Sequence, residues 1–282
     1  MMRWLLVGSA VASSVAGCSL LVPSDGLSGG DEVTRDASVA PLADATSPAD
    51  GGIVTVDGGD ATGGTDAYRA SIVANGPIAY FRFEESSGTI CRNEIAGSPI
   101  TCLYPPSNVT FGRPGAIGRC VRTDTDNAQL SVTGPTDFPD DVPFTVELWV
   151  KFEQTSAITA IFKQMANGAG LRTGSWLLTK STGEAFSETW KEGEHNLYTF
   201  KSGPLPLDRF VHIALVHSDR DYLYVDGASG EGSILKPGVK RVATGVPMLV
   251  SGLIGCVDEL AIYDKALTPA DFAAHITARP QP

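Results

Sequence analysis

The fold is decided by nine residues, Phe144-Thr145-Val146-Glu147-Leu148-Trp149-Val150-Lys151-Phe152, whose side chains alternate in character. Successive side chains of a β-strand point to opposite faces. One face of this segment is therefore apolar, and the other carries Thr145, Glu147, Trp149 and Lys151. The alternation predicts a half-buried strand with one face against a core.

Further strand patterns lie on both sides of this segment. They cover residues 78–84, 210–216, 221–225 and 254–263, and a hairpin-turn signal, Asp226-Gly227, follows the third. Helical features gather at the C-terminus, where Thr268 suits an N-cap and Pro269 the first helical position. Many short strands with one terminal helix predict an all-β sandwich of two antiparallel sheets with a short C-terminal helix.

The N-terminal residues have the pattern of a secretory signal. Arg3 precedes a short uncharged run that ends in Val15-Ala16-Gly17-Cys18. These four residues resemble the lipobox of bacterial lipoproteins. The resemblance implies a signal peptide over residues 1–17, lipidation of Cys18 and anchoring in the cell envelope by several acyl chains. Ser19 stands where Asp would favour the inner membrane, so the outer membrane is favoured. An ordinary signal peptide with a chance cysteine is the alternative.

Residues 18–66 read as a disordered, acidic linker rich in Gly, Asp, Ala, Ser and Thr. Such a composition buries too little apolar surface to offset the entropy of ordering. Nine acids and one base fall between Asp25 and Asp66, and this segment accounts for most of the net charge of −11. No basic stripe is present, so we expect no nucleic-acid partner. The folded domain is expected over residues 67–282.

Five segments, in order along the chain, resemble the laminin-G-like branch of the concanavalin A-like lectin/glucanase superfamily. They are residues 79–88, Gly115-Ala116-Ile117-Gly118-Arg119-Cys120-Val121, 144–150, 210–227 and Gly255-Cys256-Val257-Asp258-Glu259-Leu260-Ala261-Ile262-Tyr263 with the following 266–268. The resemblance implies a jelly-roll sandwich. It implies little about activity, because this fold hosts binding modules, adhesion domains and glycosidases.

Four cysteines remain after Cys18, and an even number in an exported domain suggests two disulfides. Four cysteines allow three pairings. Cys91 and Cys102 flank a short loop, so a bridge between them is the simplest, and it leaves Cys120 to pair with Cys256. No Cys-x-x-Cys spacing supports a metal site instead.

No catalytic motif is apparent, so the sequence predicts that the chain is not an enzyme. Sandwich glycosidases place paired acids on one strand, but Glu147 is followed two residues later by Trp149. The stretch from Glu188 to Glu194 contains no interposed Asp and reads as a solvated loop. The four histidines are widely spaced in the sequence.

Exposed aromatics could serve as flat platforms for a sugar. The candidates are Trp149, Trp176, Trp190 and Tyr198, and packing in a core is the alternative for each. Members of the superfamily often hold a structural calcium at the edge of the sandwich. By that resemblance Glu84 and Asp258 are candidate ligands, because carboxylate oxygens suit Ca²⁺. Ordinary strand-end hydrogen bonds are the alternative for Asp258.

The sequence leaves three functional hypotheses open. The leading one is a non-catalytic, surface-displayed module that binds glycan or polysaccharide. The second is a protein-interaction or envelope-structural domain, and the third is an unusual glycosidase. The partners expected are the lipid bilayer, through acylated Cys18, and a glycan or an envelope protein.

Overall fold

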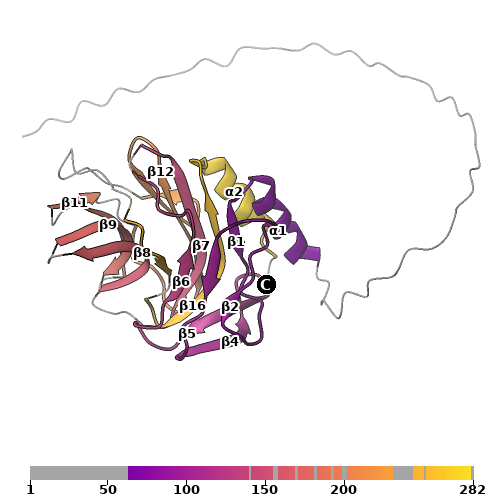
Figure 1. Cartoon of the computed structure of the whole chain (residues 1–282). Helices are drawn as coiled ribbons and strands as arrows, with labels where there is room; N and C mark the ends of the chain where they lie inside the picture. Colours follow the sequence, from indigo (N-terminus) through magenta and orange to yellow (C-terminus); the bar gives the residue numbers. More distant parts are fainter. Residues whose placement is uncertain are drawn as a thin grey trace, which may run out of the picture. The chain divides into compact units, whose positions relative to one another are not determined.

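The structure is a computed structural model that describes residues 63–139, 141–154, 158–168, 171–180, 183–191, 194–198, 202–230, 244–250 and 252–280 (Figure 1). The predicted signal peptide, lipidated Cys18 and nearly all of the predicted linker lie outside the described residues. No helix within the described ranges is both long enough and apolar enough to cross a bilayer.

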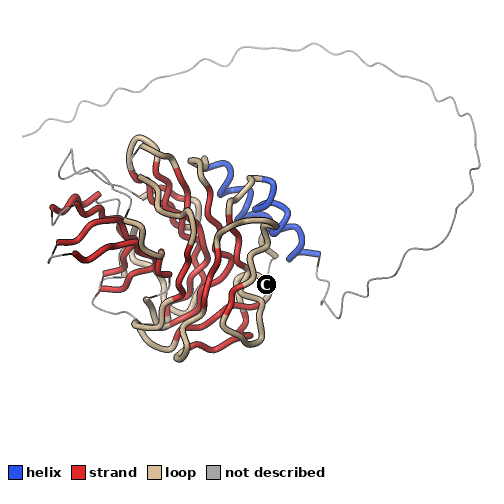
Figure 2. The backbone as a smooth tube through the Cα atoms, viewed as in Figure 1, coloured by secondary structure: helices blue, strands red, loops and turns tan. Residues whose placement is uncertain are grey.

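The described strands form two antiparallel sheets, which confirms the predicted sandwich (Figures 1 and 2). Sheet A contains, in spatial order, β14 (Ala228–Ser229), β13 (Asp221–Val225), β12 (Phe210–His217), β7 (Phe144–Phe152), β16 (Gly255–Tyr263), β5 (Arg119–Thr123) and β4 (Val109–Pro114), and β1 (Ala79–Phe81) also pairs with β16. Sheet B contains β11 (Glu194–Tyr198), β10 (Ala185–Lys191), β9 (Leu171–Lys180), β8 (Ile158–Gly168), β15 (Met248–Val250), β6 (Leu130–Thr133), β3 (Thr101–Leu103) and β2 (Ile90–Cys91).

The main core lies between the two sheets. The apolar face of β7, with Val146, Leu148 and Val150, packs into the same buried cluster as Leu130 and Val250 of sheet B. This is the core face that the alternation of β7 predicts. Burial of such aliphatic side chains contributes roughly 1.5–3 kcal/mol each.

The opposite face of β7 is also buried, which the sequence did not predict. Helices α1 (Gly63–Ala74) and α2 (Pro269–Ala278) lie side by side over this face of sheet A (Figures 1 and 2). Thr145 and Glu147 are fully buried and Trp149 is 2% exposed, whereas Lys151 remains partly exposed. A second core of Trp149, Phe272 and their neighbours fills the space beneath the helices.

One of the two helices was predicted from the sequence and the other was not. Thr268 caps α2 as predicted, because its side chain accepts from the Asp271 backbone while the Asp271 carboxylate accepts from the Thr268 backbone N–H. Helix α1 was not predicted, since it begins with two glycines, which are poor helix formers. Tyr68 and Ile72, one turn apart on α1, are fully buried against sheet A. Helix α1 therefore begins at Gly63, inside the predicted linker.

Both predicted disulfides are present. Cys91–Cys102 joins neighbouring strands β2 and β3 and closes a separation of 11 residues. Cys120–Cys256 joins β5 to β16 across a separation of 136 residues. The second bridge therefore fixes two strands of sheet A that are distant in the sequence.

Candidate functional site

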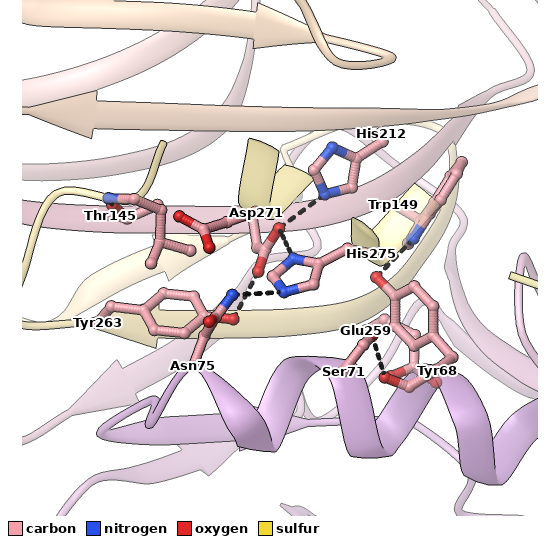
Figure 3. A network of polar contacts seen from close by, with 12 residues as sticks. Tyr68, Ser71, Asn75, Thr145, Trp149, His212, Glu259, Tyr263, Asp271 and His275 are labelled. Atoms are coloured by element: carbon pink, nitrogen blue, oxygen red, sulfur yellow. Dashed lines mark hydrogen bonds and ion pairs between the residues drawn. The ribbon is translucent and has the colours of Figure 1, made fainter. Parts of the chain in front are cut away.

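A buried polar network lies between sheet A and the two helices (Figure 3). Glu147 of β7 is at its centre. The Glu147 Oε2 accepts from His212 Nε2 of β12 at 2.8 Å and from His275 Nδ1 of α2 at 3.1 Å. The Glu147 Oε1 accepts from the Tyr263 hydroxyl at 2.6 Å. One carboxylate thus links three strands and a helix.

Asn75, just after α1, extends this network. Its Nδ2 lies 2.9 Å from His275 Nε2, so the His275 ring is held between Asn75 and Glu147. Burial raises the pKa of Glu147, but the hydrogen bonds from His212 and His275 together outweigh it and lower the pKa to about 2. Glu147 is therefore ionised. Its side chain is fully buried.

Trp149 is held within the same region and cannot offer a face to a sugar. Its indole Nε1 donates to the Tyr68 hydroxyl of α1 at 2.8 Å. The guanidinium of Arg279 lies 4.6 Å from the centre of its ring. The prediction that Trp149 is a ligand platform is therefore wrong, because α1 and α2 cover the face of β7 on which it stands.

The outer face of sheet B offers a different surface. Within the described ranges both helices lie over sheet A, and neither covers sheet B (Figure 1). Residues paired directly across antiparallel strands share a face. One paired row crosses every strand of sheet B, in the order Ile90, Leu103, Ser131, Leu249, Lys163, Trp176, Glu188 and Leu197.

This row lies on the face turned away from the core. Ile90 and Leu103 at one end are 63% and 45% exposed. On β10, the neighbouring Ser187 points the other way, because its hydroxyl donates to Asp221 of sheet A at 2.9 Å. The position of Glu188, one residue on, is therefore on the outer face.

The register also separates the remaining predicted aromatics. The position of Trp176 pairs with that of Glu188, and Trp190 lies two residues beyond Glu188, so both tryptophan positions belong to the outer face. Tyr198 instead pairs with the inward-facing Ser187. The register therefore keeps Trp176 and Trp190 together and places Tyr198 on the other face of sheet B.

A pocket of about 350 Å³ opens where the chain leaves β1 and returns through β2. We call it the edge pocket, and its walls are Arg82, Phe83, Glu84, Glu85, Arg92 and Glu94. Phe83 has a φ of 60°, a conformation that costs a bulky residue roughly 1–3 kcal/mol. Its side chain is buried in the main core. The turn at Phe83 lets its neighbours Arg82, Glu84 and Glu85 line one pocket instead of alternating.

The two predicted calcium ligands accept hydrogen bonds from the backbone of one turn, residues 115–119, beside this pocket. Asp258 Oδ2 accepts from the backbone of Ala116 and Ile117 at 2.8 and 3.0 Å, and Glu84 Oε1 accepts from that of Arg119 at 3.1 Å. A side chain at Gly118 would collide with the Glu84 carboxylate, which explains the glycine there.

These two carboxylates could supply some, but not all, of the oxygen ligands of a calcium ion. Burial raises the pKa of Asp258, and the adjacent Glu259 raises it further. Asp258 Oδ1 is buried and has no hydrogen-bond partner among the described residues. No group of three or more His, Cys, Asp or Glu side chains in the described ranges is arranged to hold a metal. An ion here would therefore take most of its six to eight oxygens from carbonyls and water.

Part of the sequence matches the model of a known protein family. Residues 123–273, more than half of the sequence, match the family model described as concanavalin A-like lectin/glucanases superfamily. The chain belongs to this superfamily. The predicted resemblance is thus confirmed for the sandwich. A comparison with curated proteins gives no significant match.

Solved structures share the fold at low sequence identity. Domain 4 of AbnA, an extracellular arabinanase from Geobacillus stearothermophilus in complex with arabinotriose, is 16% identical, with a TM-score of 0.53 over 72% of this chain and 98% of that domain. Trypanosoma rangeli sialidase is 10% identical, with a TM-score of 0.53 over 76% of this chain and 38% of the sialidase. The botulinum neurotoxin serotype D binding domain is 10% identical, with a TM-score of 0.53 over 74% and 52%. The chain thus corresponds to only part of the last two proteins.

The edge pocket and the role of His275 escaped sequence reasoning. Arg92 and Glu94 belong to no motif, and they meet Glu84 and Glu85 only because β1 and β2 bring the two loops together. His275 carried one weak signal, since it lies three residues after the core residue Phe272 on an amphipathic helix.

Proposed function

We propose that this protein is a non-catalytic module that binds glycan on the outer face of sheet B. The observation that carries the proposal is the asymmetry of the sandwich. The helices close the outer face of sheet A, whereas the outer face of sheet B carries the positions of Trp176 and Trp190 in neighbouring strands. Polar positions, Lys163 and Glu188, pair with Trp176 in the same row. Aromatic rings flanked by hydrogen-bonding groups are suited to ring-shaped, hydroxylated ligands.

The superfamily and its structures support a role in carbohydrate binding. The AbnA domain was solved with arabinotriose, and this chain covers nearly all of that domain. The non-catalytic part of the proposal rests on the central carboxylate, Glu147, being sealed beneath the helices.

Pull-down of the full-length protein with insoluble arabinan, xylan, cellulose and chitin tests the proposal. We expect at least one polysaccharide to retain the protein, and the double substitution Trp176→Ala/Trp190→Ala to release it. Trp149→Phe is the matched control, because it replaces a buried indole by a smaller ring that cannot donate to Tyr68, and it should lower stability while binding persists. No retention by any of the four would contradict the proposal.

Measurement of reducing-sugar release in the same samples tests the absence of catalysis. We expect no release above that of the polysaccharide alone. Release that disappears in Glu84→Gln would instead favour a glycosidase, since Glu84 is a half-buried acid whose pKa is raised by burial.

We also propose that Asp258 and Glu84 bind a calcium ion that fastens the turn between Gly115 and Arg119. The unpartnered Asp258 Oδ1 supports this. Calcium should raise the unfolding temperature of the native protein and leave Asp258→Asn unchanged. An equal response in both proteins, or none in either, would contradict the ion.

The tether is a further proposal, made from the sequence. We propose that Cys18 is acylated and anchors the domain in the bacterial envelope, with the outer membrane favoured by Ser19. Labelling of cells with radioactive palmitate should mark the native protein but not Cys18→Ser. An unlabelled native protein would indicate an ordinary cleaved signal.

A further inference from the structure

The walls of the edge pocket carry charges of both signs. Two guanidinium groups, of Arg82 and Arg92, face three carboxylates, of Glu84, Glu85 and Glu94. An anion entering the pocket would meet the three carboxylates, and a cation would meet the two guanidinium groups. Hydroxyl groups both donate and accept, so a neutral hydroxylated ligand can use both kinds of wall.

Several walls are fixed before any ligand arrives. Glu85 accepts from the Arg92 backbone and from the Tyr104 hydroxyl, each at 2.6 Å. Glu94 accepts from Arg69 at 2.9 Å, and Arg82 donates to the buried Glu259 at 3.2 Å. Groups held in this way lose little further entropy when a ligand binds.

Two walls retain capacity for a ligand. The Arg92 side chain is 80% exposed, and among the described residues its Nε forms a 3.4 Å ion pair with Glu94. The Glu84 side chain is 36% exposed, and only its Oε1 takes part in the described contacts. A free guanidinium end and a free carboxylate oxygen therefore border the same space. Hydrogen bonds to such charged groups are stronger than those between neutral groups.

The size and lining of the edge pocket limit the class of ligand that can bind there. Its volume is near the lower end of the range for small-molecule pockets, roughly 300–1,000 Å³. The Phe83 ring belongs to the main core, where it stacks on Phe81, so it leaves no aromatic floor. A pocket that is small, lined mainly by charged side chains and without a stacking surface suits a single unit held by its hydroxyls. It does not suit a long chain lying flat.

We infer that the edge pocket binds one neutral, polyhydroxylated unit, a free sugar or the end of a glycan chain. The inference deepens the proposed function and rests on it, because it adds a pocket for a single unit to a sheet face suited to longer chains. The two surfaces are built from different residues, so they can be tested separately.

Saturation-transfer NMR on the full-length protein tests the pocket directly. The probes are arabinose, xylose, glucose, galactose and N-acetylglucosamine, with glucuronate and glucosamine as charged counterparts. We expect at least one neutral sugar to bind, and to bind more tightly than both charged sugars. Arg92→Ala should weaken that binding roughly tenfold, because a charged hydrogen-bond donor is lost. Glu84→Gln should weaken it as well, in a buffer without calcium, because Glu84 is also a proposed calcium ligand.

Arg209→Ala is the matched control, since Arg209 is exposed, forms one ion pair with Asp226 and does not line the pocket. It should leave sugar binding unchanged, as should Trp176→Ala/Trp190→Ala. Equal effects of Arg92→Ala and Arg209→Ala, or tighter binding of a charged sugar, would overturn the inference. If no monosaccharide binds but a polysaccharide still retains the protein, the edge-pocket inference is wrong and the proposed binding on sheet B stands. If neither binds, both proposals are wrong.

Discussion

Glu147 is a fully buried carboxylate that accepts hydrogen bonds from His212, His275 and Tyr263. Glu147→Ala would leave these buried groups without their acceptor, so we expect it to destabilise the fold by roughly 3–5 kcal/mol in urea unfolding. Glu153→Ala is the control, because the ion pair of Glu153 with Arg122 is partly exposed, at 21% and 23%, and its loss should cost about 1 kcal/mol or less. Equal losses of unfolding free energy in the two variants would show that the buried network adds no more stability than a partly exposed ion pair.

The same residue predicts a dependence of stability on pH. The pKa of Glu147 is about 2 in the fold, below its ordinary value of 4.5. A carboxyl whose pKa is lowered on folding stabilises the fold above its unfolded pKa, and this contribution is lost as the pH falls through the folded value. The difference in unfolding free energy between the native protein and Glu147→Gln should therefore shrink between pH 4.5 and 2. A constant difference across that window would contradict the ionised state.

At the scale of elements, α1 is an integral part of the domain. Ile72 is fully buried beneath it, whereas the adjacent Val73 is 37% exposed. Ile72→Ala should therefore cost roughly 2–5 kcal/mol of unfolding free energy, and Val73→Ala less than about 1 kcal/mol. If both substitutions were equally mild, α1 would be a detachable extension of the linker.

The two disulfides should also differ in their contributions. In the chain-entropy model a loop of 11 residues contributes about 3 kcal/mol and one of 136 residues about 5 kcal/mol. Thermal unfolding should therefore show a larger loss for Cys120→Ser/Cys256→Ser than for Cys91→Ser/Cys102→Ser. The reverse order would indicate that strain or residual structure in the unfolded chain outweighs loop length.

Local pattern predicted the strands but not what covers them. The alternation of β7 identified both of its faces, yet Trp149 is covered by helices that begin at Gly63 and at Pro269. Contacts between segments so distant in sequence leave no periodic signal in either. The α2 helix was predictable because its cap is local, whereas α1 is stabilised mainly by tertiary packing of Tyr68 and Ile72.

For the whole molecule, the sandwich could be predicted and its binding surfaces only in part. The tryptophan positions were recognisable as aromatics in strands, but their shared face depends on the pairing of β9 with β10. The edge pocket depends on loops from β1 and β2 meeting beside a turned Phe83. Both surfaces are products of register and topology, which a single sequence specifies only through the complete fold.

We propose that the outer face of sheet A is closed by the helices and that the outer face of sheet B receives the ligand. Hydrogen–deuterium exchange of the full-length protein, with and without a soluble fragment of the retained polysaccharide, tests this most directly. We predict slower exchange in β9 and β10 on binding and no change in α1 or α2. Protection confined to the helices, with β9 and β10 unchanged, would contradict the account.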